Sequence, residues 1–179
     1  MATCIFCNAV KGETKFRKIY EDAEVFAVAH PRGAAPGHIL VFPKKHYQIF
    51  EQIPDYEITH LFSVVNKLSI AVFEGIKAEG TNIIIQNGVA AGQEIPHVCI
   101  HIIPRKQDDE LPLQWKPKRL TEEQMSAVEL KLKGAASEIG AFETEKKKEH
   151  VKTEKEETKI LKAEKEKENY MIRQLERIP

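Results

Sequence analysis

The sequence has no excess of charge of either sign and no long hydrophobic run. Its 179 residues contain 27 Lys and Arg and 27 Asp and Glu, so the formal net charge is zero. A balanced charge argues against a nucleic-acid-binding surface and against electrostatic docking on anionic membranes. No apolar segment approaches the roughly 20 residues that a membrane-spanning helix needs. We therefore predict neither a nucleic-acid partner nor a membrane partner.

Cysteine is scarce, with three residues in the whole chain. The N-terminus, Met1 to Cys4, has no basic segment followed by a long apolar stretch, which is the pattern of a secretory signal. An odd number of cysteines without such a signal argues against disulfides and favours reduced thiols or metal ligands. These features predict a cytoplasmic protein.

Composition changes sharply near residue 143. Residues 145–168 contain nine Lys and eight Glu. This segment has too few apolar side chains to form a core, but its opposite charges recur at helical spacing, which suits a solvated helix. An apolar face returns at residues 170–178, either to dock on a surface such as a partner subunit or as a frayed tail. We predict a compact domain at 1–120 and a highly charged helical extension at 121–179.

Short apolar runs with period-two alternation predict five strands, and turn residues separate them. The strands are expected at residues 16–21, 24–29, 37–43, 82–87 and 98–104. Apolar residues spaced by three and four predict one long helix, with Asp55 as N-cap and Gly80 as terminator. A weaker helix is expected from Thr121, in a capping-box pattern, to about Gly140. The fold class is α+β, an antiparallel sheet crossed by a long helix.

One segment concentrates groups that exchange protons. His97, Cys99 and His101 alternate with Val98, Ile100 and Ile102, so a strand would place the two imidazoles and the thiol on one face. Imidazoles can donate hydrogen bonds to an anion, shuttle protons or attack phosphorus. The preceding glycine-rich turn, residues 88–92, allows backbone N–H groups to approach a ligand. The alternative is a strand whose histidines only cap polar rims.

The segment from His97 to His101 resembles the His-x-His-x-His-x-x signature of the histidine triad (HIT) nucleotide hydrolases and transferases. Three further segments extend this resemblance over about residues 4–106. The Pro-Gly-His-Ile-Leu-Val-Phe-Pro-Lys-Lys-His run at 36–46 resembles the family's second signature, and residues 86–93 resemble its nucleotide loop. The Cys4-Ile-Phe-Cys7 pair resembles the zinc-bearing branch.

The resemblance implies a homodimeric α+β fold with a nucleotide site on each subunit. In this family the middle histidine attacks the α-phosphate, and water cleaves the covalent nucleotidyl intermediate. By position, His101 and the first histidine, His97, would flank the phosphate, while Gln93 would bond phosphate or the leaving group. Gln86 would lie near the ribose or phosphate. The substrates implied are dinucleoside polyphosphates or adenosine phosphoramidate-like compounds.

Two positions depart from the family pattern. Cys99 occupies the nucleophile position, and a free thiol is mostly protonated at neutral pH, with a pKa of about 8.5, and shorter than an imidazole. A displacement of about 1 Å can cost on the order of a hundredfold in rate, so we predict nucleotide binding with impaired turnover. His30 occupies a position where the family commonly holds the ribose with an acidic or amide residue. An imidazole can make one such bond but cannot grip two hydroxyls.

Cys4 and Cys7 have a two-residue spacing that lets both thiolates reach one tetrahedral ion, although buried thiols or a redox pair would also fit. The zinc-bearing branch supplies the two remaining ligands at the positions of His46 and His97. A closed set of two Cys and two His would hold a structural Zn²⁺ without an open position for water. His38 is expected either to support the triad histidines or to have no role in the site.

Three functions are thus compared. The first is a triad-type enzyme that acts on a nucleotide and whose turnover is impaired by Cys99. The second is a non-catalytic nucleotide-binding or sensing module whose C-terminal helix binds a partner. The third is a scaffold in which the charged extension carries the function. The density of motifs in residues 4–106 favours the first two.

Overall fold

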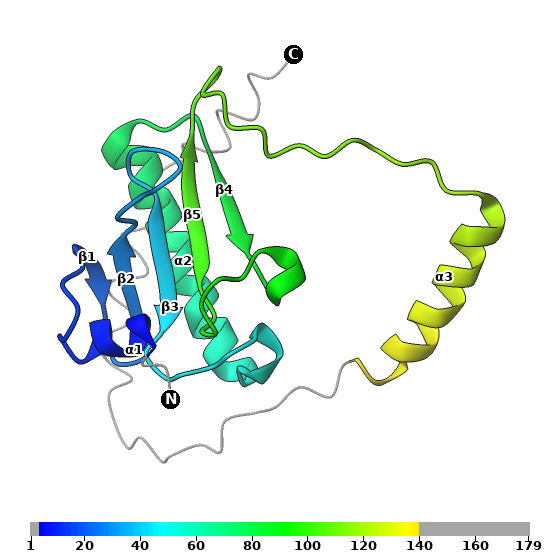
Figure 1. Cartoon of the computed structure of the whole chain (residues 1–179), viewed down its shortest axis with the longest axis horizontal. Coiled ribbons are helices and arrows are strands. Elements are labelled where there is room, and N and C mark those ends of the chain that lie inside the picture. Colours follow the sequence, from blue (N-terminus) through cyan, green and yellow to red (C-terminus); the bar gives the residue numbers. More distant parts are fainter. Residues whose placement is uncertain (1–3, 140–179) are drawn as a thin grey trace, which may run out of the picture. The chain divides into compact units, whose positions relative to one another are not determined.

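The computed structural model describes residues 4–139, which contain a five-stranded antiparallel sheet (Figure 1). The order across the sheet is β1-β2-β3-β5-β4. The strands are β1 (Lys18–Glu21), β2 (Val25–Ala29), β3 (Ile39–Pro43), β4 (Gly80–Ile85) and β5 (Ile100–Arg105). The predicted α+β class is confirmed, and all five predicted strands are present with shifted ends. The strand expected to begin at Val98 begins two residues later, at Ile100.

Side chains that alternate along the strands build a separate core on each face of the sheet. On one face, seven residues pack with the long helix: Val25, Ala27, Ile39, Val41, Val98, Ile100 and Ile102. On the other face, Phe26, Val28, Leu40 and Phe42 pack with Phe6 and Ala9 of the short helix α1 (Ile5–Val10). The period-two pattern of the sequence thus gives the central strands β2 and β3 two buried faces, and Cys99 lies with the second core.

The long helix is α2 (Asp55–Ile76), which lies against the sheet (Figure 1). Two details of the prediction are wrong. Pro54 is the N-cap, and Asp55 is the first helical residue, where its carboxylate complements the helix dipole. The helix ends at Ile76, and its C-cap Lys77 adopts the left-handed conformation with φ 54° and ψ 46°, whereas Gly80 already pairs with Arg105 in the sheet.

The second predicted helix is α3 (Glu122–Ala135), and a 3₁₀ turn over Ala136–Glu138 follows it. The expected capping box is present: the Gln124 backbone N–H donates to the Thr121 hydroxyl at 3.2 Å, and the Thr121 backbone N–H donates to the Gln124 side chain at 3.0 Å. The charged helix at 145–168 and the apolar face at 170–178 lie outside the described residues. Within the described residues, no helix has the length and apolar character to cross a membrane.

Asp22 links the turn between β1 and β2 to helix α2. Its carboxylate accepts hydrogen bonds from the backbone N–H groups of Glu24 and Val25 at 2.8 and 2.7 Å and pairs with His60 at 2.8 Å. Burial alone would raise the pKa of Asp22, but these bonds outweigh burial and lower the pKa to about 2. The charged form is therefore stabilised in the folded protein.

The Asp22→Asn variant is expected to be less stable than the wild type by about 2 kcal/mol at pH 6. Because the folded pKa lies below the unfolded one, the contribution of Asp22 is complete above about pH 4 and is lost as the pH falls toward 2. Urea unfolding of both proteins between pH 6 and pH 2 measures the difference. A difference in the free energy of unfolding that stays constant over this pH range would contradict the lowered pKa of Asp22.

Candidate functional site

One pocket is lined by candidate residues from the triad-like segment and from segments that precede it in the sequence. Its polar lining comes from the end of β2, the start of β5 and the loop after β4. An apolar wall of Ile5, Phe6, Phe16, Leu40 and Ile95 completes it. The polar and charged residues that line it are His30, Arg32, Gln86, Gln93, Glu94, His97, Cys99 and His101. The structure therefore brings together every residue predicted to be catalytic or nucleotide-binding.

Cys99 and His101 reach this pocket because of the alternation at the start of β5. Val98, Ile100 and Ile102 point into the core under α2, so the residues between them face the opposite side. Cys99 is half-buried among the aromatic and aliphatic side chains of the second core. Desolvation raises the pKa of the Cys99 thiol, and the backbone of Val41 offsets this only in part. At neutral pH the group between the two histidines is therefore a thiol.

Gln93 lines the pocket and also holds the loop that forms its rim. Its side-chain carbonyl accepts a bond from the Gly88 N–H at 2.8 Å, while its amide donates to the carbonyls of Gln48 at 2.7 Å and Ile95 at 2.9 Å. Gly92 has φ +89°, and a Cβ there would lie 2.6 Å from the Gln86 side-chain nitrogen. Glycine is thus needed at position 92 for its backbone conformation, which other residues rarely adopt.

His38 belongs to the site although its role was left open by the sequence. It is 6% exposed, and its Nε2 lies 3.1 Å from His101 Nδ1. Its ring stacks on His30 with centroids 4.5 Å apart. Desolvation lowers the pKa of His38 to about 4, with smaller contributions from the two neighbouring imidazoles. The position of His38 just before β3, whose register pairs Leu40 with His101, is the only sequence signal for this contact.

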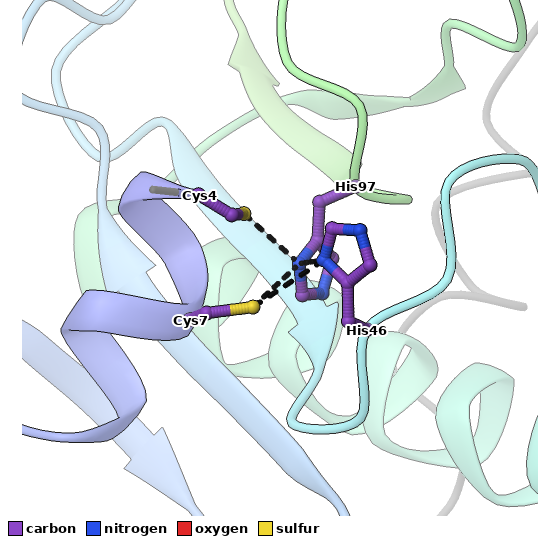
Figure 2. Close-up of side chains that lie close together, drawn as sticks. All are labelled: Cys4, Cys7, His46 and His97. Atoms are coloured by element: carbon purple, nitrogen blue, oxygen red, sulfur yellow. Dashed lines mark hydrogen bonds between the residues drawn. The ribbon is translucent and has the colours of Figure 1, made fainter. Parts of the chain in front are cut away.

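A second cluster lies beside the pocket and contains the four predicted metal ligands (Figure 2). Cys4 and Cys7 come from the N-terminal end of the chain, His46 follows β3, and His97 precedes β5. The four ligand atoms all lie within 4.8 Å of one another. This metal cluster therefore joins three segments that are far apart in the sequence.

Four of the six distances between the ligand atoms of the metal cluster are close to the edges of a tetrahedron. The His97 Nδ1 lies 3.4 Å from the Cys4 sulfur, 3.7 Å from the Cys7 sulfur and 3.2 Å from His46 Nδ1. The Cys7 sulfur lies 3.3 Å from His46 Nδ1. With metal–sulfur and metal–nitrogen bonds of about 2.3 and 2.0 Å, a tetrahedral site would have S···N edges of about 3.6 Å and an N···N edge of about 3.3 Å. The donor set and these four distances are compatible with a tetrahedral zinc ion.

The surroundings of His97 fix the nitrogen that would bind a metal. The ring is 1% exposed, and its Nε2 lies 2.9 Å from the Pro43 carbonyl oxygen. A carbonyl only accepts, so Nε2 carries the proton and Nδ1 presents a lone pair to the two sulfurs. Burial lowers the pKa of His97, which favours this neutral form. His97 lines the pocket, but both of its ring nitrogens already have polar neighbours, Pro43 on one side and the other three members of the cluster on the other.

Comparison with known proteins agrees with this geometry. The HIT domain matches residues 11–108, more than half of the chain. The chain belongs to the HIT family. An uncharacterized HIT-like protein of Methanocaldococcus jannaschii is 42% identical over 106 residues, covering 59% of this chain and 81% of that protein. The adenosine 5'-monophosphoramidase of Candida albicans is 34% identical over 111 residues, covering 60% of this chain and 73% of that enzyme.

A zinc-bound histidine triad protein from Mycobacterium smegmatis has the same fold, with a TM-score of 0.59 and 32% identity. The match covers 74% of this chain and 97% of that structure. The predicted family resemblance is confirmed, because the HIT domain matches residues 11–108 and the related proteins include a named adenosine 5'-monophosphoramidase. That Cys99 and His30 depart from the family pattern stays a prediction from the sequence.

Proposed function

We propose that this HIT protein binds an adenosine nucleotide in the pocket and acts on its phosphoryl group only slowly. The observation that carries the proposal is the convergence of His30, Gln86, Gln93 and His101 with an apolar wall in one cavity. The apolar wall suits a nucleobase, and the polar side chains suit a phosphate. An adenosine phosphoramidate-like compound or a dinucleoside polyphosphate would be the substrate, as the adenosine-specific name of one relative suggests.

The weak step in this proposal is nucleophilic attack. Attack by the Cys99 sulfur on the α-phosphorus would form an S–P bond and break the bond to the leaving group, which would take up a proton. Water would then cleave the S–P bond and return the thiol. Because the raised pKa keeps the thiol protonated, few molecules carry the thiolate that attacks. The alternative function, a non-catalytic nucleotide-binding module, follows if the thiol never attacks.

Mass spectrometry during turnover separates the two functions. The wild-type chain, incubated with adenosine 5'-phosphoramidate, is expected to release AMP slowly and to carry a small fraction of adenylate on Cys99. The mass of the intact protein and of the Cys99-containing peptide measures that fraction. Release of AMP at the same rate by the wild type and by Cys99→Ser would exclude the thiol as nucleophile. Absence of any AMP release would leave the binding module as the function.

We further propose that the metal cluster holds a structural Zn²⁺. The four donors fill a tetrahedral shell, so no position remains for a catalytic water. Bound zinc would supply a fixed cross-link between the N-terminus, the loop after β3 and the start of β5. His97 would then hold the backbone beside Cys99 in place, which is how the metal cluster would serve the pocket.

A homodimer is the assembly that we propose. On α2, Phe62, Ile70 and Ile76 are 37–44% exposed, and Ile83 on β4 is 46% exposed. In the part of the chain that the structure describes, β4 pairs only with β5 and forms one edge of the sheet. An edge strand beside apolar side chains is suited to continue its sheet into a second copy. The cytoplasmic location and the domain boundary at residue 120 stay predictions.

A further inference from the structure

His30, His38 and His101 form a compact cluster at the polar side of the pocket. One ring nitrogen of each lies within 4.8 Å of one from each of the others. The strand register produces this arrangement: the His30 N–H donates to the His38 carbonyl at 2.8 Å, and β3 pairs with β5 at Leu40 and His101. Three imidazoles at such distances can bind a metal ion or form hydrogen bonds to another group. Which of the two they do depends on which ring nitrogens carry the protons.

Backbone N–H groups fix the protons of this histidine cluster. The Arg32 N–H donates to His30 Nδ1 at 3.0 Å, and the Ala34 N–H donates to His38 Nδ1 at 3.0 Å. A neutral imidazole has one N–H, so both rings carry it on Nε2. The His38 Nε2–H then donates to His101 Nδ1 at 3.1 Å, which leaves the proton of His101 on Nε2 as well.

These proton positions are unfavourable for binding a metal ion. A metal-binding imidazole needs a lone pair toward the ion and an N–H toward an acceptor, which is what His97 has with Pro43. In His30 and His38 the acceptor nitrogen is already bonded to a backbone N–H, and the outward nitrogen carries the proton. The histidine cluster is therefore a set of N–H donors, whereas the metal cluster offers lone pairs.

We infer that His30 and His101 both donate their Nε2–H groups to one oxyanion, the phosphoryl group of the bound nucleotide. This inference rests on the proposed nucleotide binding and makes His30 a phosphate-binding residue instead of a sugar-binding one. The rings of His30 and His101 both line the pocket with their centroids 6.2 Å apart, so that two oxygens of one phosphate between them could accept bonds of about 2.8 Å from the two N–H groups. Arg32, which also lines the pocket, adds a positive charge beside them.

The pKa shifts of His30 and His101 favour neutral imidazoles, each with one N–H group to donate. Desolvation lowers the pKa of His30, and Arg32 lowers it further against the smaller, opposite effect of Glu94. Desolvation also lowers the pKa of His101. An Asp at position 30 would have no proton to donate and would place a negative charge next to the phosphate. The histidine is therefore the better residue at this position for an oxyanion.

Calorimetric titrations of AMP and of adenosine into the zinc-loaded full-length chain test the inference. His30→Asp is expected to weaken AMP binding about ten- to a hundredfold and to leave adenosine binding unchanged, since a bond to a charged group is lost. His30→Asn, whose side chain is similar in size to that of Asp but has an N–H donor, is expected to retain more of the AMP affinity than His30→Asp. His60→Gln, at a histidine bonded to Asp22 outside the pocket, is the matched control.

Other outcomes would overturn the inference in distinct ways. Equal changes in AMP and adenosine binding for His30→Asp would show that His30 contacts the sugar. If the wild type binds neither ligand, the proposed function fails, and the protons of the cluster are still testable. Nitrogen-15 shifts of the imidazoles should show unprotonated Nδ1 in His30, His38 and His101. A second zinc equivalent that is lost in His38→Ala would contradict the donor assignment.

Discussion

The Cys99→His variant is expected to hydrolyse adenosine 5'-phosphoramidate at least about a hundredfold faster than the wild type. The pocket of the wild type holds a protonated thiol at this position, and its histidine cluster presents N–H groups instead of lone pairs. A histidine at position 99 would restore a ring nitrogen whose lone pair is available at neutral pH. Steady-state rates of AMP release from both proteins measure the gain.

Cys99→Ser is the matched control, because its hydroxyl has nearly the size of the thiol but is a weaker nucleophile at neutral pH. It is expected to bind AMP like the wild type and to release none from the phosphoramidate. If Cys99→His folds, binds AMP and stays as slow as the wild type, then the residue at position 99 does not limit turnover. The impairment would then lie in the histidine cluster or the loop.

Removal of the proposed Zn²⁺ is expected to lower the melting temperature by at least about 10 °C. A ligand present at a thousand times its dissociation constant stabilises the folded state by about 4 kcal/mol. A change of that size shifts the midpoint of a domain of about 100 residues by well over 10 °C. Helix α1 has only six residues, and its place on the sheet depends on Phe6, which stacks on Phe42 at 4.4 Å, and on the two cysteines.

Melting curves with and without a chelator, together with those of Cys7→Ser, measure this contribution. Cys99→Ser serves again as the control, since Cys99 is not a member of the metal cluster. The control should melt like the wild type and lose stability when the chelator is added. A Cys7→Ser protein that melts like the wild type and still holds one equivalent of zinc would contradict the ligand set.

The sheet and the pocket were largely predictable because alternation and turn residues are local signals. The positions of Val98, Ile100 and Ile102 indicated which face of β5 is buried under α2, and so which face carries Cys99 and His101. The ends of elements were less predictable. Lys77 ends α2 in a left-handed conformation that a glycine would adopt more readily, so the sequence pointed to Gly80 instead.

Features that depend on distant contacts could not be predicted from local patterns. Helix α1 has no capping side chain, and its position follows from packing of Phe6 and Ala9 on the sheet. The contact between His38 and His101 joins residues 63 positions apart. The protons of the histidine cluster depend on the backbone N–H groups of Arg32 and Ala34, which no residue type reveals.

Titration of AMP into the wild-type chain tests the central claim most directly. The account predicts saturable binding of one AMP per chain, competed by inorganic phosphate, with little or no turnover of the phosphoramidate by the same preparation. The polar side of the pocket, with His30, Arg32 and His101, would hold the phosphate. Absence of AMP binding by zinc-loaded, folded protein would contradict the account and direct attention to the charged extension.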